Sequence, residues 1–184
     1  VVASLATHYH WDHIGGTMRG MRVPGVDVIP GLKEWAEMPM DVHVPKWEVD
    51  EAAKQTAIDR DAIQPLEDLQ TMNIGRVQLK FYHTPGHSPG SMCFLVSVAE
   101  VEDQDPTPIL LITGDTVFPG SCGRLDLPGS DPRVMYDSLR RVATTFPDHL
   151  PLYPGHGYAG TSSTIGQEKR QGFLRPEITR EDWN

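Results

Sequence analysis

A cluster of metal-ligating residues near the start of the sequence constrains this chain more than any other feature. Four potential ligands fall within six positions, and we call them the histidine motif: His8, His10, Asp12 and His13. Imidazole and carboxylate groups suit zinc, iron and manganese, and gathering four of them in an apolar fold is costly unless a cation binds them. The alternative is a solvated His-rich loop or a tag remnant. An apolar run at 1–6 and Ile14-Gly15-Gly16 flank the motif, which predicts a strand that leads into a tight turn.

The spacing within the histidine motif predicts two metal ions. Residues two apart in an extended strand point the same way, so His8 and His10 are expected to bind one ion together. Asp12 and His13 follow where the chain must turn, and their diverging side chains are expected to reach a second ion beside the first. The pattern differs from the helical His-Glu-x-x-His arrangement, which depends on i, i+4 spacing.

Two coordination spheres need further ligands, and the chain offers three candidates that each follow an apolar run. We call them the three-loop group: His87, Asp115 and His156. The preceding runs, at 77–82, 109–112 and 150–153, are predicted strands. A single His or Asp in such a turn can simply cap its own backbone. Three of them in Gly-rich loops are typical of a scaffold that presents ligands from several loops to one point.

The ordered set of ligands resembles the metal-binding pattern of the metallo-β-lactamase superfamily. The resemblance spans residues 7–157 and fills all seven positions of the two-metal pattern. Its implied ligands are His8, His10 and His87 for the first ion, Asp12, His13 and His156 for the second, and Asp115 as the bridge between them. The cofactors it implies are two divalent metal ions, with zinc favoured over iron or manganese.

Within the superfamily, four segments resemble the glyoxalase II group of thioester hydrolases. They are Thr84-Pro85-Gly86-His87, Gly114-Asp115-Thr116-Val117-Phe118, Cys122-Gly123-Arg124 and Tyr153-Pro154-Gly155-His156-Gly157-Tyr158. Class B β-lactamases are less similar, because they typically have Cys at the position of Asp115. The resemblance implies an α/β fold, a four-layer αββα sandwich, as a single domain over residues 1–184. Superfamily members usually have several strands and a helix before the first motif, so we expect part of the N-terminal half to be missing here.

The reaction implied by the resemblance is hydrolysis by a hydroxide that bridges the two metal ions. Coordination lowers the pKa of water from ~16 to about 7, so no Ser or Cys nucleophile is required. One metal would polarise the substrate carbonyl. Catalytic roles are expected for Asp115, which would hold the metals together, and for Asp12, which would orient the hydroxide. A thioester such as a hydroxyacylglutathione suits this chemistry, because a thiolate leaves with less acid assistance than an amine.

Two further residues match positions that contact glutathione in glyoxalase II enzymes. Arg124 has a fixed positive charge that suits a carboxylate, and Tyr158 matches a tyrosine of the same site. The alternative role of Arg124 is an ion pair with Asp126 or Asp131. Asp126 stands where the family often has Tyr, and it adds a negative charge beside the expected glutathione site. Only 26 residues follow Tyr158, so the family's separate C-terminal substrate domain is not expected.

Three alternatives to thioester hydrolysis fit parts of the pattern: two other activities and one non-catalytic role. Persulfide dioxygenases share the segment Cys122-Gly123-Arg124-Leu125-Asp126, and they bind one Fe(II) through residues that match His8, His87 and Asp115. The segment Pro154-Gly155-His156 favours the hydrolase, since those dioxygenases tend to have Ala before this His. A lactonase would use the same hydroxide on another activated carbonyl. A non-catalytic metal-binding fragment is the third alternative.

Composition argues against several classes of partner. With 16 basic and 25 acidic residues the net charge is −9, and no Lys/Arg run stands out, so nucleic acid is not an expected partner. No apolar stretch approaches the ~20 residues of a membrane span, and no signal peptide precedes Val1. Cys93 and Cys122 make no disulfide framework, which favours a reducing compartment. We expect a cytoplasmic enzyme with a small-molecule substrate. If the short chain is instead a natural variant, a partner chain or a homo-oligomer is expected to cover its exposed sheet edge.

Two helices are predicted outside the ligand loops. Residues 132–145 form one, with Asp131 as its cap and Pro132 at its first position. Its predicted core-facing residues are Val134, Tyr136, Leu139 and Val142. The polar, Ala-containing segment 50–63 is predicted as a surface helix.

The Pro-punctuated section 23–49 predicts loop and short strand, in which Trp35 and Trp47 are expected to pack rather than to bind a ligand. His43 and His83 fall outside the matched motifs and are predicted to be surface or packing histidines.

Overall fold

The computed structural model describes residues 2–16, 29–100 and 104–183. The chain divides into two compact units, Val1–Glu67 and Asp68–Asn184, and each is described by itself. Both units combine a β-sheet with helices, so the predicted α/β class is confirmed. The single domain over residues 1–184 stays a prediction.

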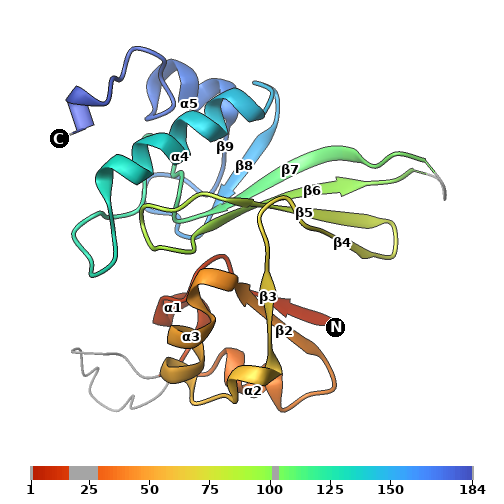
Figure 1. Cartoon of the computed structure of the whole chain (residues 1–184). Helices are drawn as coiled ribbons and strands as arrows, with labels where there is room; N and C mark the ends of the chain where they lie inside the picture. Colours follow the sequence, from red (N-terminus) through yellow and green to blue (C-terminus); the bar gives the residue numbers. More distant parts are fainter. Residues whose placement is uncertain (1, 17–28, 101–103, 184) are drawn as a thin grey trace. The chain divides into compact units, whose positions relative to one another are not determined.

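The first unit is built on a parallel sheet of three strands in the order β1-β2-β3 (Figure 1). The strands are β1 (Ala3–Leu5), β2 (Asp41–Pro45) and β3 (Ile63–Leu66). The helical segments are α1 (Trp11–Ile14), α2 (Leu32–Ala36), η1 (Lys46–Glu48), α3 (Val49–Thr56) and η2 (Arg60–Ala62). Parallel neighbours need crossover connections, and these segments lie within them.

The core of the first unit joins its sheet to α1 and α3. Val42 and Val44 of β2 are 1% and 0% exposed and belong to the same cluster as Val49 and Ala52. Ile14, the last residue of α1, is buried in this cluster as well. Short helices are marginal by themselves, so α1 depends on this packing. The core therefore fixes the helical turn that contains the second half of the histidine motif.

A sheet of six strands forms the second unit, and the strands lie side by side in chain order (Figure 1). They are β4 (Thr71–Ile74), β5 (Val77–His83), β6 (Met92–Val98), β7 (Thr107–Gly114), β8 (Pro151–Pro154) and β9 (Ser163–Thr164). The helical segments are α4 (Pro132–Thr145), α5 (Ile165–Gln171) and η3 (Glu181–Trp183). Residues of α4 and α5 share one core cluster with β5, β6, β7 and β8, which places both helices against the sheet.

The topology of this sheet places the three ligand loops at one edge. β5 and β7 are both antiparallel to β6, and β8 is parallel to β7. The carboxyl ends of β5, β7 and β8 therefore lie at the same edge, and His87, Asp115 and His156 follow these ends. The strands predicted at 77–82, 109–112 and 150–153 are confirmed.

The helix predicted at 132–145 is confirmed as α4. The carboxylate of Asp131 accepts hydrogen bonds from the backbone N–H groups of Arg133, at 2.8 Å, and Val134, at 3.2 Å. This caps two of the N–H groups that have no partner within the helix. Among the described residues, no helix combines the length and the apolar character needed to cross a lipid bilayer.

The predicted core face of α4 is partly wrong. Leu139 and Val142 are buried, but Val134 and Tyr136 are only half-buried. The other buried positions are Met135 and Ser138. The buried set 135, 138, 139 and 142 follows the i, i+3, i+4, i+7 spacing of one helix face, which the predicted set did not.

The helix predicted at 50–63 is too long. α3 ends at Thr56, where Ala57 adopts a left-handed φ of 55°, and the chain continues through η2 into β3. The surface prediction is also incomplete, since Ala52 and Ala53 are buried against the sheet of the first unit.

In section 23–49, residues 23–28 lie outside the described residues. The remainder contains the predicted short strand, β2, and also α2, which the Pro-rich pattern did not indicate. Trp35 and Trp47 are 40% and 41% exposed, so they lie outside the core, and the prediction that they pack rather than bind a ligand stays a prediction. Of the two histidines predicted to be surface or packing residues, His43 is buried in β2, where burial lowers its pKa, and His83 is half-buried.

The core of the second unit is tested by Leu139→Ala. Leu139 is 1% exposed and shares a cluster with Leu111 and Leu152, so its truncation leaves a cavity that costs about 3 kcal/mol of unfolding free energy. Thr145→Ala, at the exposed end of the same helix, is the control and should change the unfolding free energy by no more than about 0.5 kcal/mol. Urea unfolding measures both, and equal effects would contradict the assigned core.

Candidate metal centre

The first unit brings three imidazoles of the histidine motif together. The ring centroid of His8 lies 4.7 Å from that of His10 and 4.0 Å from that of His13. His8 is fully buried, His10 and His13 are half-buried, and Asp12 is exposed. Clustered nitrogen donors of this kind are suited to a divalent transition metal.

The predicted reason for this convergence is wrong. β1 ends at Leu5, so His8 and His10 do not lie in a strand. His10 instead has an extended backbone at the N-terminal cap of α1, and the N–H groups of His13 and Ile14 bond to its carbonyl oxygen. A short loop followed by one helical turn therefore gathers the motif. Trp11–Ile14 is too short and too irregular in sequence for periodicity to reveal it.

Two side chains of the first unit hold the backbone of this loop. The N–H of Tyr9 donates a 2.8 Å hydrogen bond to Oε2 of Glu48, which is 2% exposed. Nε2 of Gln55 donates to the carbonyl oxygens of Tyr9, at 3.0 Å, and Gly15, at 3.1 Å. Glu48 and Gln55 are not evident from the sequence, because a single acid or amide in a polar helical segment looks like an exposed residue.

The second unit brings the three-loop group together around one carboxylate. Oδ2 of Asp115 lies 3.4 Å from Nε2 of His87 and 3.5 Å from Nε2 of His156. The side chains of His87 and Asp115 are 3% and 8% exposed, and that of His156 is 22% exposed. A nearly buried carboxylate that faces two imidazole nitrogens can share a cation with both. This donor set fits a metal of the zinc, iron or manganese type.

The tautomer of His87 is fixed by the backbone. Its Nδ1 lies 2.9 Å from the carbonyl oxygen of Arg124. A carbonyl oxygen can only accept a hydrogen bond, so Nδ1 carries a proton, which in the neutral ring leaves Nε2 with the lone pair that a metal ion needs. A metal-ligating histidine usually has such a second hydrogen bond, which orients the ring. The sequence does not reveal this partner, because a backbone carbonyl 37 positions away leaves no mark on the residue pattern.

Gly123 lets the Arg124 loop approach the ligands. Its N–H donates a 2.9 Å hydrogen bond to the carbonyl oxygen of Asp115. A Cβ at this position would collide with that oxygen and would lie 2.8 Å from Nδ1 of His87. The absence of a side chain is therefore a steric requirement of the packing around two predicted ligands.

Further hydrogen bonds tie the loops of the second unit to one another. The hydroxyls of Thr84 and Thr116 lie 2.9 Å apart, which joins the loop of His87 to that of Asp115. The N–H of Gly155, next to His156, donates to the carbonyl oxygen of Gly114 at 2.8 Å. Ser138 of α4 donates to the Pro85 carbonyl at 2.6 Å. These contacts restrict the three ligands to one geometry, as a metal site requires.

Two aromatic side chains, Tyr158 and Phe118, lie beside His156. The ring of Tyr158 stacks on that of His156 with a centroid distance of 5.0 Å and an interplanar angle of 18°, and Phe118 meets Tyr158 edge-on at 5.6 Å. Tyr158 is 77% exposed. It therefore offers an accessible ring face or hydroxyl next to a predicted ligand, as its assignment to substrate binding requires.

The side chain of Arg124 is paired with Asp126. Its Nε and Nη2 donate to the two carboxylate oxygens of Asp126 at 2.7 and 2.8 Å, in the bidentate geometry that guanidinium favours. This hydrogen bonding holds the pKa of Asp126 at about 2. The ion pair with Asp126 is thus present, whereas Asp131 caps α4. A contact of Arg124 with substrate stays a prediction.

Both cysteines are free, as the sequence suggested. Burial raises the pKa of Cys93 to about 11 and that of Cys122 to about 12. Each thiol is therefore protonated near neutral pH, and the thiol form is a poor nucleophile.

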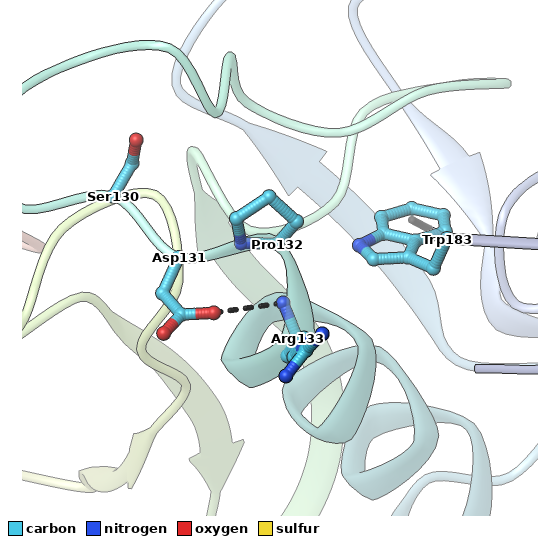
Figure 2. Close-up of a pocket in the computed structure, with 5 residues that line it drawn as sticks. All are labelled: Ser130, Asp131, Pro132, Arg133 and Trp183. Carbon is cyan, nitrogen blue, oxygen red and sulfur yellow. Dashed lines mark hydrogen bonds between the residues drawn. The ribbon is translucent and has the colours of Figure 1, made fainter. Parts of the chain in front are cut away.

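A separate pocket of about 400 Å³ opens at the start of α4 (Figure 2). Its lining residues are Ser130, Asp131, Pro132, Arg133 and Trp183. None of the seven predicted ligands lines it. Figure 2 shows that the Asp131 carboxylate is engaged with the backbone of Arg133, so this carboxylate serves the helix cap.

Gly123→Ala tests the packing around His87. The added methyl group has no room against Asp115 and His87, so we expect a loss of about 2 kcal/mol of unfolding free energy and at least a tenfold loss of zinc affinity. Gly157→Ala is the matched control, because it also adjoins a predicted ligand but its Cβ would lie 3.4 Å from its nearest neighbour. Thermal unfolding and zinc titration compare the two, and a harmless Gly123→Ala would contradict the assigned packing.

Comparison with known proteins identifies one family. The family model described as the metallo-beta-lactamase superfamily matches residues 3–156, a span that contains all seven predicted ligands. Among curated proteins, the chain is 31% identical over 156 residues to the "Probable polyketide biosynthesis zinc-dependent hydrolase PksB" of Bacillus subtilis, a match that covers 85% of this chain and 56% of that protein. It is 30% identical over 182 residues to the "Probable hydroxyacylglutathione hydrolase glo2" of Schizosaccharomyces pombe, with 96% and 55% covered.

A solved structure agrees with these matches. The crystal structure of a metallo-beta-lactamase from Staphylococcus aureus superposes with a TM-score of 0.76 at 26% sequence identity, and it covers 100% of this chain and 51% of that one. The chain spans about half the length of each of these three proteins.

Proposed function

Because the chain belongs to the metallo-beta-lactamase superfamily, we propose that it is a metal-dependent hydrolase that cleaves a thioester such as a hydroxyacylglutathione. Two relatives support this proposal, one named as a zinc-dependent hydrolase and one as a hydroxyacylglutathione hydrolase. The single observation that carries it is the position of the Asp115 carboxylate, whose Oδ2 lies within 3.5 Å of Nε2 of both His87 and His156.

We assign the histidine motif and the three-loop group to one centre with two divalent ions, most suitably zinc. The assignment of all seven residues to one centre depends on their order along the chain, which matches the superfamily pattern. In that pattern His87 and His156 bind different ions. A single carboxylate oxygen that faces a ligand of each ion is the arrangement expected of a bridging residue, so Asp115 has this role in the proposal.

The chemistry divides between the ions and the protein. When bound, divalent ions lower the pKa of water and act as Lewis acids toward a carbonyl oxygen. The protein holds the ligands: the Arg124 carbonyl keeps the proton of His87 on Nδ1, and the threonine pair Thr84 and Thr116 fixes the distance between two ligand loops. Asp12, which is exposed, has the proposed role of orienting the attacking water by accepting its hydrogen bond.

The proposed substrate site is supported by fewer contacts than the proposed metal ligands. Tyr158 provides an accessible ring next to His156, and Arg124 provides a guanidinium that a carboxylate of the substrate could reach after displacing Asp126. Exposed ion pairs are weak, so this displacement is energetically modest. We propose that both residues bind the thiol carrier of the substrate. A lactone is the competing substrate, since it presents a similar activated carbonyl.

A substrate panel on the purified, zinc-loaded protein tests the proposal. We expect hydrolysis of S-lactoylglutathione and other thioesters, two zinc ions per chain, and no oxygen uptake. Hydrolysis of lactones alone would change the substrate class. One tightly bound iron with oxygen uptake on glutathione persulfide would identify a persulfide dioxygenase and refute the hydrolase proposal. Those dioxygenases share the segment Cys122-Gly123-Arg124-Leu125-Asp126.

Asp115→Ala is expected to abolish turnover, by a factor of at least about 10³, and to reduce the zinc content, because a carboxylate in contact with both ions is lost. Asp105→Ala removes an exposed carboxylate from the same unit and serves as the control. Metal analysis and the thioester assay measure both variants, and unchanged turnover in Asp115→Ala would refute the bridging role.

Cys122→Ser separates metal-dependent hydrolysis from nucleophilic catalysis by cysteine. Since burial raises the pKa of this thiol to about 12, Cys122 is protonated and does not attack the substrate at neutral pH. We expect the variant to keep turnover within about threefold, and iodoacetamide at pH 7.5 to leave the native protein active. Loss of turnover with full zinc content would indicate a cysteine nucleophile instead.

A further inference from the structure

The backbone of Tyr9 is held from both sides by side chains of the first unit. Its N–H bonds to Glu48 and its carbonyl oxygen bonds to Gln55. Tyr9 separates His8 from His10, so its two peptide groups are those that connect these two ligands. The directions in which residues i and i+2 point are set by the dihedral angles between them. A contact that fixes this peptide segment therefore fixes how the two imidazoles converge.

Gln55 also reaches the other end of the histidine motif. The same Nε2 that donates to Tyr9 donates to the carbonyl oxygen of Gly15 at 3.1 Å. Asp12 and His13 lie between these two positions, in the single helical turn of α1. One amide group on α3 thus ties together both ends of the segment 9–15. Because α3 is packed into the core of the first unit, this tie connects the motif to a rigid element.

The burial of Glu48 indicates that its hydrogen bond to Tyr9 is part of the folded core and not a chance surface contact. A carboxylate that is 2% exposed is costly to desolvate, and hydrogen bonds to its charged form offset that cost. The 2.8 Å bond from Tyr9 is one such bond. A loop that needed no fixed conformation would not require the buried carboxylate of Glu48 or the two hydrogen bonds of the Gln55 amide.

We propose that Glu48 and Gln55 are positioning residues for metal binding, which hold the peptide groups around Tyr9 so that the ligands of the histidine motif converge on a cation. The inference depends on the proposed function, since it assumes that the motif binds metal. Neither residue touches the ion in this proposal. Each acts through the backbone that connects the ligands.

Two variants of the same shape separate this role from ordinary packing. Gln55→Glu replaces an amide donor by a carboxylate oxygen that faces two carbonyl oxygens, whereas Glu48→Gln keeps an acceptor oxygen for the N–H of Tyr9. Zinc affinity of the metal-free protein is measured by competition with a chelator. We expect Gln55→Glu to bind zinc about 10- to 100-fold more weakly, the usual effect of losing a hydrogen-bond partner near a ligand. Glu48→Gln should lose about fivefold or less.

Whether Gln55→Glu weakens or strengthens zinc binding distinguishes the positioning role from a purely electrostatic effect. An added negative charge attracts a cation, so electrostatics alone predicts tighter zinc binding in this variant. Gln55→Met, which removes the donor without adding charge, should also weaken binding by at least about tenfold, and it replaces Gln55→Glu if that variant does not fold. Thermal unfolding of the metal-free proteins reports whether folding is intact.

Zinc affinity equal to or above the wild-type value in folded Gln55→Glu or Gln55→Met would overturn the positioning role. Equal losses in Glu48→Gln and Gln55→Glu would also overturn it, because these two substitutions share shape but not hydrogen-bonding character. A wild-type protein that binds no zinc would refute the proposed function itself. The two failures are therefore distinguishable.

Discussion

The contact of a nearly buried carboxylate with two imidazole nitrogens is the constraint that the ligand loops of the second unit must satisfy. Asp115 lies at the end of β7 with Oδ2 between Nε2 of His87 and Nε2 of His156. Desolvating such a charge is unfavourable unless positive charge compensates it, which protonated imidazoles or a shared cation can supply. The sheet topology brings the three loops to one edge, and the hydroxyl pair Thr84 and Thr116 joins two of them.

Polar groups of each unit hold the predicted ligands in place. The carbonyl oxygen of Arg124 selects the tautomer of His87, and Gly123 leaves the space that this contact needs. In the first unit, Glu48 and Gln55 have a comparable relation to the histidine motif, although they act on its backbone rather than on its rings. Both kinds of contact would preorganise the ligands of the proposed centre, which favours tight metal binding.

The sequence predicted those parts of the structure that follow from local rules. Asp131 and Pro132 marked the start of α4, and the apolar runs before His87, Asp115 and His156 marked the ends of three strands. The turn that contains Asp12 and His13 was predicted as a turn but not as a helix, because four residues contain too little periodicity. α2 was missed for the same reason. Glu48 and Gln55 were missed because their roles depend on tertiary contacts across about 40 positions of sequence.

In the proposed function, one centre holds two ions and Asp115 bridges them. Anomalous diffraction at the zinc edge from crystals of the zinc-loaded protein tests it most directly. We expect two peaks roughly 3.5 to 4 Å apart, with the carboxylate of Asp115 in contact with both and with His87 and His156 on different ions. A single peak bound by His87 and Asp115 but not by His156, or two peaks without a shared carboxylate, would contradict it.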